Sequence, residues 1–67
     1  MITVKINGQN KEIEETTTIF DFLKMNDVVP IEVTLEYNLK VISYEDIKKI
    51  VLKNGDTLEV LRFVGGG

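Results

Sequence analysis

The chain has 67 residues and a formal net charge of −3, and it contains neither cysteine nor histidine. This length suffices for one small domain without a deep catalytic cavity, and the missing residue types exclude disulfides, thiolate nucleophiles and the usual zinc sites. The charge argues against nucleic-acid binding, and no hydrophobic run is long enough to span a membrane. We therefore expect a cytoplasmic protein with no nucleic-acid partner and no membrane partner.

The N-terminal residues predict a β-hairpin. Ile2, Val4 and Ile6 alternate with polar residues, which is the pattern of a half-buried strand. Asn7 and Gly8 then supply the pair of positive-φ residues that a two-residue hairpin turn favours. Residues 11–15 form the predicted returning strand.

Residues 18–25 predict a short amphipathic helix. Thr18 and Asp21 have the spacing of a capping box, with Asp in the place where Glu is more common. Ile19, Phe22 and Leu23 follow at helical spacing and form one hydrophobic face. We expect this face to pack inward.

The rest of the chain predicts three strands and a second helical turn. Hydrophobic residues alternate with polar ones over residues 31–37, Asn38 favours a turn, and residues 40–42 are a short strand candidate. Ser43 and Asp46 repeat the capping spacing at the start of a helical turn over residues 44–49. A turn at residues 54–56 precedes the last strand, residues 57–63.

The predicted order of elements is β-β-α-β-β-β with one small extra helix. A helix this short is buried only by packing on a sheet, so we predict an α+β fold. The arrangement is that of a β-grasp, or ubiquitin-like, domain: a mixed sheet of four to five strands, one main helix across one face and a short second helical turn. The first and last strands are expected to lie parallel at its centre.

The last strand is expected to have two different faces. Leu58 and Val60 are predicted to face the core, which leaves Leu61 and Phe63 on the opposite face, followed by Val64. Hydrophobic side chains close together near a chain end are candidates for a partner-docking patch. The alternative is that they are scattered surface hydrophobes, which are common.

The chain ends in three glycines, Gly65, Gly66 and Gly67. Glycine has no side chain to bury and loses the most backbone entropy on folding, so these residues do not hold the domain together. We expect a globular domain over residues 1–63 and a flexible tail over residues 64–67, slender enough to thread a narrow channel. The α-carboxylate of Gly67 is ionised at neutral pH. It is a nucleophile toward an activated phosphate when another protein positions both groups; the alternative is a frayed end without function.

Two further features have simpler interpretations than a site. The loop at residues 54–56 is interpreted as a turn and not as a phosphate-binding loop, because a single glycine next to Asp56 is a poor anion site. Glu12, Glu14 and Glu15 are interpreted as a solvated face that discourages edge-to-edge strand pairing, and not as catalytic carboxylates.

The last third of the chain, VLKNGDTLEVLRFVGGG (residues 51–67), resembles the C-terminal part of the ThiS family of sulfur carriers, in which a K-x-G-D turn, a strand and an aromatic-x-G-G ending recur. The resemblance extends through TTTIFDFL (residues 16–23) and VTLEYN (residues 33–38). The family often has N-G-x-x-V-P after the third strand. Here Leu39 and Ser43 stand in place of the glycine and the proline.

The resemblance implies that the chain is not an enzyme but a carrier of sulfur for the thiazole ring of thiamine. It implies that an E1-like, ThiF-type enzyme uses ATP to adenylate Gly67, and that the chain itself binds no cofactor. Sulfur supplied through a cysteine desulfurase then replaces AMP, and the resulting thiocarboxylate donates sulfur to a ThiG-type thiazole synthase. Gly65 and Gly66 correspond to the tail, and Phe63 to the aromatic residue before it. The alternatives are a MoaD-like carrier for molybdopterin, tRNA thiolation or protein modification, and a β-grasp binding module with an irrelevant tail.

Overall fold

The computed structural model describes residues 1–62, with the backbone alone at residue 62. Along these residues the elements are β1 (Ile2–Ile6), β2 (Gln9–Ile13), α1 (Ile19–Met25), the 3₁₀ helix η1 (Pro30–Glu32), β3 (Val33–Tyr37), β4 (Lys40–Ile42), α2 (Tyr44–Ile47) and β5 (Thr57–Arg62). No helix in this part of the chain has the length and hydrophobicity needed to cross a membrane.

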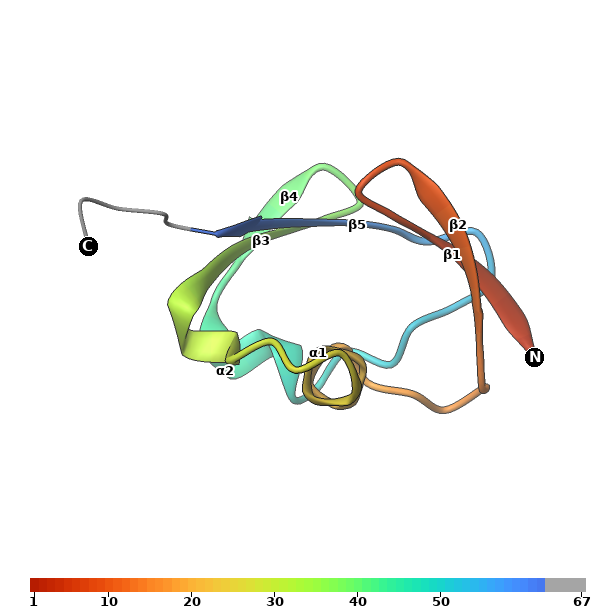
Figure 1. Cartoon of the computed structure of the whole chain (residues 1–67), viewed down its shortest axis with the longest axis horizontal. Coiled ribbons are helices and arrows are strands. Elements are labelled where there is room, and N and C mark those ends of the chain that lie inside the picture. The colour runs from red at the N-terminus through yellow and green to blue at the C-terminus, as the bar shows by residue number, and fades with distance from the viewer. Residues whose placement is uncertain (63–67) are drawn as a thin grey trace.

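The five strands form one mixed sheet in the order β2-β1-β5-β3-β4. The pair β1 and β5 is parallel, and the other three pairs are antiparallel. The sheet forms one layer, and α1 and α2 lie in a second layer on one of its faces (Figure 1). The predicted β-grasp fold, with parallel first and last strands at its centre, is therefore confirmed.

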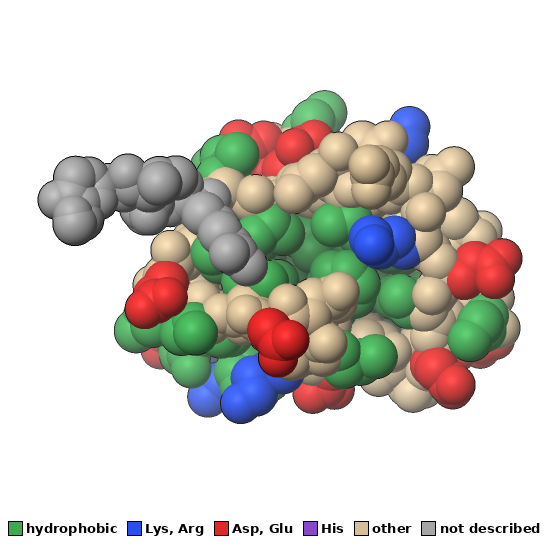
Figure 2. Space-filling view, viewed as in Figure 1, with side chains coloured by type: hydrophobic (Ala, Val, Ile, Leu, Met, Phe, Trp, Pro, Cys, Tyr) green, Lys and Arg blue, Asp and Glu red, His purple; other side chains and the backbone are tan. Residues whose placement is uncertain are grey.

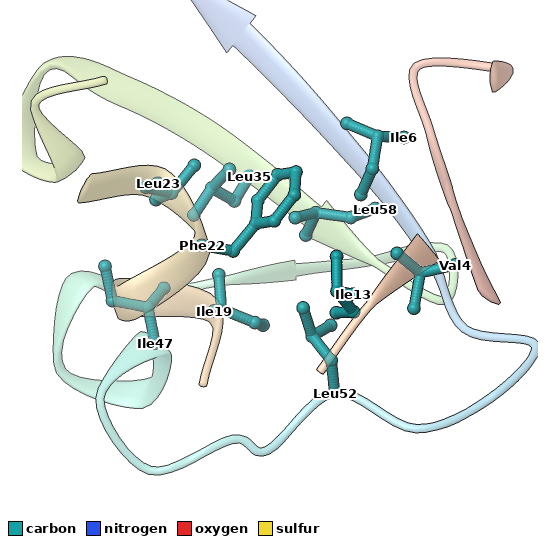
Figure 3. Packing of buried hydrophobic residues seen from close by; sticks show 10 residues of the cluster. All are labelled: Val4, Ile6, Ile13, Ile19, Phe22, Leu23, Leu35, Ile47, Leu52 and Leu58. Atoms are coloured by element: carbon teal, nitrogen blue, oxygen red, sulfur yellow. The ribbon is translucent and has the colours of Figure 1, made fainter. Parts of the chain in front are cut away.

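The core lies between the sheet and the two helices. Every strand except β4, together with α1, α2 and the segment before β5, contributes a side chain to it, and these side chains point toward one another in Figure 3. Burial of this cluster is the main force that holds so small a domain together, because there is no disulfide. Its members are Val4, Ile6, Ile13, Ile19, Phe22, Leu23, Leu35, Ile47, Leu52 and Leu58.

Both helices begin as the capping residues predict. The Thr18 hydroxyl accepts a hydrogen bond from the backbone N–H of Asp21 at 3.0 Å, which satisfies one of the free donors at the start of α1. At α2, Ser43 and Asp46 form a full capping box. Ser43 therefore serves as a helix cap at the position where the family often has proline.

Three predicted boundaries are wrong. The third strand does not begin at residue 31, because Pro30 starts a 3₁₀ turn and leaves Ile31 exposed to solvent. The returning strand of the first hairpin is β2 and not residues 11–15, since a two-residue turn at Asn7 and Gly8 pairs Ile6 directly with Gln9. The second helical turn ends at Ile47. Residue 63, predicted as the end of the last strand, lies outside the described residues.

Candidate functional site

Strand β5 leads from the core to the C-terminal end of the chain. It is flanked by β1 and β3, but β1 pairs only with its first two residues, Thr57 and Leu58. The pairing with β3 continues to the end of the strand, where Val33 lies opposite Arg62. The last part of β5 is thus held on one side by backbone hydrogen bonds to β3 and on the other by a hydrogen bond to a side chain.

This side chain is that of Asn7. The backbone N–H of Asn7 donates to the carbonyl oxygen of Leu58 at 3.0 Å, and the Asn7 Oδ1 accepts from the backbone N–H of Val60 at 2.7 Å. Strand β1 ends at Ile6, so no further backbone carbonyl of β1 is available to accept from Val60. The side-chain oxygen of Asn7 accepts this hydrogen bond instead. Sequence reasoning found Asn7 as a turn residue and missed this second role, for which only the strand register gives a signal.

The opposite end of β5 is fixed by a hydrogen-bond network around Asp56. Its carboxylate accepts from the Tyr37 hydroxyl at 2.6 Å, the Lys53 backbone N–H at 2.8 Å and the Asn38 amide at 3.2 Å. The Asn38 Oδ1 in turn accepts from the backbone N–H of Thr57 at 2.8 Å. The network joins the β3–β4 turn to the start of β5.

This network shifts two pKa values. Burial raises the pKa of Tyr37 to about 12, and the hydrogen bond to the Asp56 carboxylate and its negative charge act in the same direction. Burial also acts to raise the pKa of Asp56. The hydrogen bonds from Tyr37, Lys53 and Asn38, together with the positive charge of Lys53, outweigh that effect and leave the pKa below its usual value of 3.8.

The two faces of β5 are as different as the sequence predicts. Leu58 is fully buried, and Val60 packs against the core from the same face. Leu61 lies on the other face with 49% of its surface exposed. Its role in docking a partner remains a prediction. Phe63, Val64, Gly65, Gly66 and Gly67, the other residues predicted for docking and for the tail, lie outside the described residues.

The loop before β5 is a structural turn. Gly55 has a φ of 90°, and its N–H donates to the carbonyl oxygen of Thr3 at 2.8 Å. The N–H of Asp56 is bonded to Lys53, and the Asn54 side chain accepts from the N–H of Thr3. The N–H groups of Gly55 and Asp56 are therefore already hydrogen-bonded within the protein and are not free to cradle a phosphate.

The acidic residues of the first hairpin are solvent-exposed. Glu12 lies on the edge strand β2, and Glu14 and Glu15 follow it in the next loop. Within residues 1–62 there is no cluster of three or more acidic residues, cysteines or histidines suited to hold a metal ion. The exposure of all three side chains fits their interpretation as a solvated face.

Residues 4–67 match the sequence profile of the ThiS family. The chain belongs to the ThiS family. The family consists of small carrier proteins, not catalysts, so membership places this chain among the sulfur carriers of thiamine biosynthesis. The match includes the network residue Asp56 and extends to Gly67, beyond the last residue that the structure describes.

Solved structures of a family member have the same fold. The crystal structure of the thiamine biosynthesis protein ThiS from Geobacter metallireducens is 29% identical, with a TM-score of 0.83 over 98% of this chain and 100% of that chain. The solution structure of a thiamine biosynthesis protein from the same organism gives a TM-score of 0.80 at 29% identity, over 98% of this chain and 88% of that chain.

Sequence relatives fall into two groups. The uncharacterized protein ycf40 of Trieres chinensis is 34% identical over 97% of this chain and 89% of its own length. Two thiazole synthases are also similar, from Paramagnetospirillum magneticum (29% identical) and Magnetococcus marinus (33% identical). The two matches include 92% and 96% of this chain, but they span only 19% and 20% of the length of the synthases. A segment similar to this chain therefore forms part of each of these longer proteins.

Proposed function

We propose that this chain carries sulfur as a thiocarboxylate on Gly67 and donates it for the synthesis of the thiazole ring of thiamine. In the first step, a carboxylate oxygen of Gly67 attacks the α-phosphate of ATP, and pyrophosphate leaves. The product is an acyl-adenylate, in which AMP is a good leaving group. A sulfur nucleophile supplied through a cysteine desulfurase then attacks the acyl carbon and displaces AMP.

The chain itself supplies none of the catalytic groups for these steps. A ThiF-type, E1-like enzyme binds ATP and neutralises the charge of the reacting groups, and the chain presents its carboxylate. The domain contributes a fixed starting point for the tail, because the last residues of β5 are held by β3 on one side and by Asn7 on the other. A thiazole synthase of the ThiG type is the proposed acceptor.

The observation that carries this proposal is the match to the ThiS family over residues 4–67, which includes the glycine end. The similarity to segments of two thiazole synthases favours the thiamine pathway over molybdopterin synthesis or tRNA thiolation. A domain in the same polypeptide as a thiazole synthase has a high effective concentration at its active site, which suits a sulfur donor.

Intact mass spectrometry tests the proposal. The full chain is incubated with ATP, a ThiF-type enzyme, a cysteine desulfurase and cysteine, and we expect the mass increase of one oxygen replaced by sulfur. A variant that ends at Gly65 serves as the control, since it should fold normally and gain no sulfur. Wild-type protein that keeps its mass with ThiF-type enzymes, but changes with a molybdopterin-type activator, would move the chain to the alternative pathway.

A further inference from the structure

A groove of about 260 Å³ lies between α1 and the sheet, beside Val60 of β5. Figure 2 shows hydrophobic side chains gathered in a hollow between these two layers. The hydrophobic residues that line the groove are Ile6, Phe22, Leu23, Val28 and Val60, and the polar ones are Asn7, Lys11 and Asn26. A hydrophobic floor with a few polar groups at its rim is the usual composition of a binding site.

Lys11 places a positive charge at the rim of this groove. It lies opposite Val4 in the register of the first hairpin, in the row of β2 that also contains the buried Ile13. Side chains of one row point to the same face of a sheet, so Lys11 is on the helix side, although it is exposed. None of the described residues that line the groove is acidic. The groove therefore favours a ligand that is hydrophobic along its length and negatively charged at one end.

Two amide side chains add hydrogen-bonding groups to the rim. The Asn7 Oδ1 accepts from the Val60 N–H at 2.7 Å, so the NH₂ group of Asn7 is the part that a ligand can use. The Asn26 Nδ2 donates to the carbonyl oxygen of Phe22 at 2.8 Å, which leaves the Asn26 Oδ1 as an acceptor. A peptide segment that ends in a carboxylate matches this set, because its backbone N–H groups suit the acceptor and its carboxylate suits Lys11 and the donor.

The chain itself continues with such a segment. Five residues follow Arg62: the hydrophobic Phe63 and Val64, and then three glycines, of which Gly67 carries the free carboxylate in the proposed function. These five residues span at most roughly 18 Å when extended, whereas the way back along β5 from Arg62 to Val60 is about 7 Å. The segment is therefore long enough to reverse its direction and cover the groove.

We propose that the groove is the resting site of residues 63–67 in the free carrier, with Phe63 and Val64 against its hydrophobic floor and the Gly67 carboxylate beside Lys11. The proposal rests on the proposed function for the free carboxylate, and it adds a state in which the domain holds that carboxylate itself. Because the segment and the groove belong to one chain, their effective concentration is high, and a weak contact populates this state. The activating enzyme binds only the released fraction, so the contact lowers its apparent affinity for the carrier accordingly.

The test is NMR spectroscopy on the full chain without a partner. K11Q removes the positive charge at the rim, F63A removes the aromatic ring, and K5Q makes the same charge change on the opposite face of the same hairpin. Heteronuclear NOE values for the amides of residues 65–67 report how strongly their motion is restricted. We expect these values to be roughly a third or more lower in K11Q and F63A than in wild type, and to be unchanged in K5Q.

Proton–proton contacts identify the groove as the place where the segment is held. Wild-type protein should show NOE contacts from the Phe63 ring to the methyl groups of Val28 and Val60. Absence of these contacts, or wild-type values for residues 65–67 as low as those of K11Q and F63A, would overturn the proposal. Contacts of Phe63 that persist at full strength in K11Q would overturn the place assigned to the carboxylate. Contacts that grow with protein concentration would identify a second copy as the occupant and overturn the proposal as well.

These outcomes are separate from the fate of the proposed function, because the NMR measurement needs neither ATP nor an activating enzyme. If residues 63–67 do not occupy the groove but wild-type protein gains sulfur, only the resting site is lost. If they occupy the groove but the protein gains no sulfur with any activating enzyme, the proposed function is overturned and the resting site stands.

Discussion

Leu39 occupies a backbone conformation that favours glycine. It has a φ of 72° at the turn between β3 and β4, and its side chain is 87% exposed. A side chain in this left-handed region costs about 1 kcal/mol or more, and Leu39 gains no burial in return.

We therefore predict that L39G unfolds at a higher urea concentration than wild type, with a gain of about 1 kcal/mol in the free energy of unfolding. The control is L39A, which removes the same side chain but keeps a Cβ in the left-handed region. It should show no comparable gain. An L39G variant less stable than wild type would mean that the Leu39 side chain contributes more than its exposure indicates.

Asp56 is expected to make stability depend on acid pH. Its folded-state pKa lies below its unfolded value of 3.8, so its contribution is fully present above about pH 4 and is lost as the pH falls through the folded-state pKa. We predict that D56N is less stable than wild type by about 1.5 to 3 kcal/mol at neutral pH. The difference should shrink toward pH 2, as measured by urea unfolding at a series of pH values.

Tyr37 gives the corresponding dependence at alkaline pH. Its pKa is raised from 10.0 to about 12 in the folded protein, so its contribution is fully present below pH 10.0 and is lost as the pH rises through about 12. Wild-type protein should lose stability across this interval, and Y37F should lose less. Equal losses in the two proteins would show that other groups set the alkaline limit.

At the scale of elements, Asn7 substitutes for the missing end of β1. Its Oδ1 accepts from the N–H of Val60 where β1 no longer pairs with β5. We predict that N7G, which keeps the positive φ but loses the amide, reduces stability by about 1 kcal/mol or more and speeds hydrogen exchange at the Val60 amide. The amide of Leu61, on the β3 side of the strand, serves as the internal control. Unchanged exchange at Val60 would contradict this role.

The sequence predicts the elements well because their signals are local. Alternation marks β1 and β3, helical spacing marks α1, and capping residues mark the starts of both helices. The wrong boundaries are at η1, at β2 and at the end of α2. At η1, the alternation of Ile31 with its neighbours imitates a strand, whereas the local constraint of Pro30 favours a 3₁₀ turn.

The site is predicted less completely because its features depend on register. Leu61 is found from the alternation of one strand, with Leu58 as its buried counterpart. The hydrogen bond from Tyr37 to Asp56 joins residues 19 positions apart in the sequence, and the bond from Val60 to Asn7 joins residues 53 positions apart. No single segment contains such a signal. The tail was predicted from its composition and from the family resemblance, and its function stays a prediction.

At the scale of the whole molecule, β5 contributes both to the hydrophobic core and to the surface predicted to dock a partner. One face of the strand belongs to the core through Leu58, and the other carries Leu61, which is predicted from the sequence to dock a partner. Because successive side chains point to opposite faces, a strand can be rigid through one row of residues and bind a partner through the other. The domain is small, so its stability is on the order of 3 to 10 kcal/mol.

This division predicts opposite effects for two alanine substitutions on the same strand. L58A removes a fully buried side chain and should cost about 2 to 5 kcal/mol, a large part of the total stability. L61A removes a half-exposed side chain and should change stability by less than about 1 kcal/mol, yet weaken binding to the activating enzyme. Urea unfolding and calorimetry on both variants separate the two effects. If L61A binds the activating enzyme as tightly as wild type, Leu61 does not take part in docking.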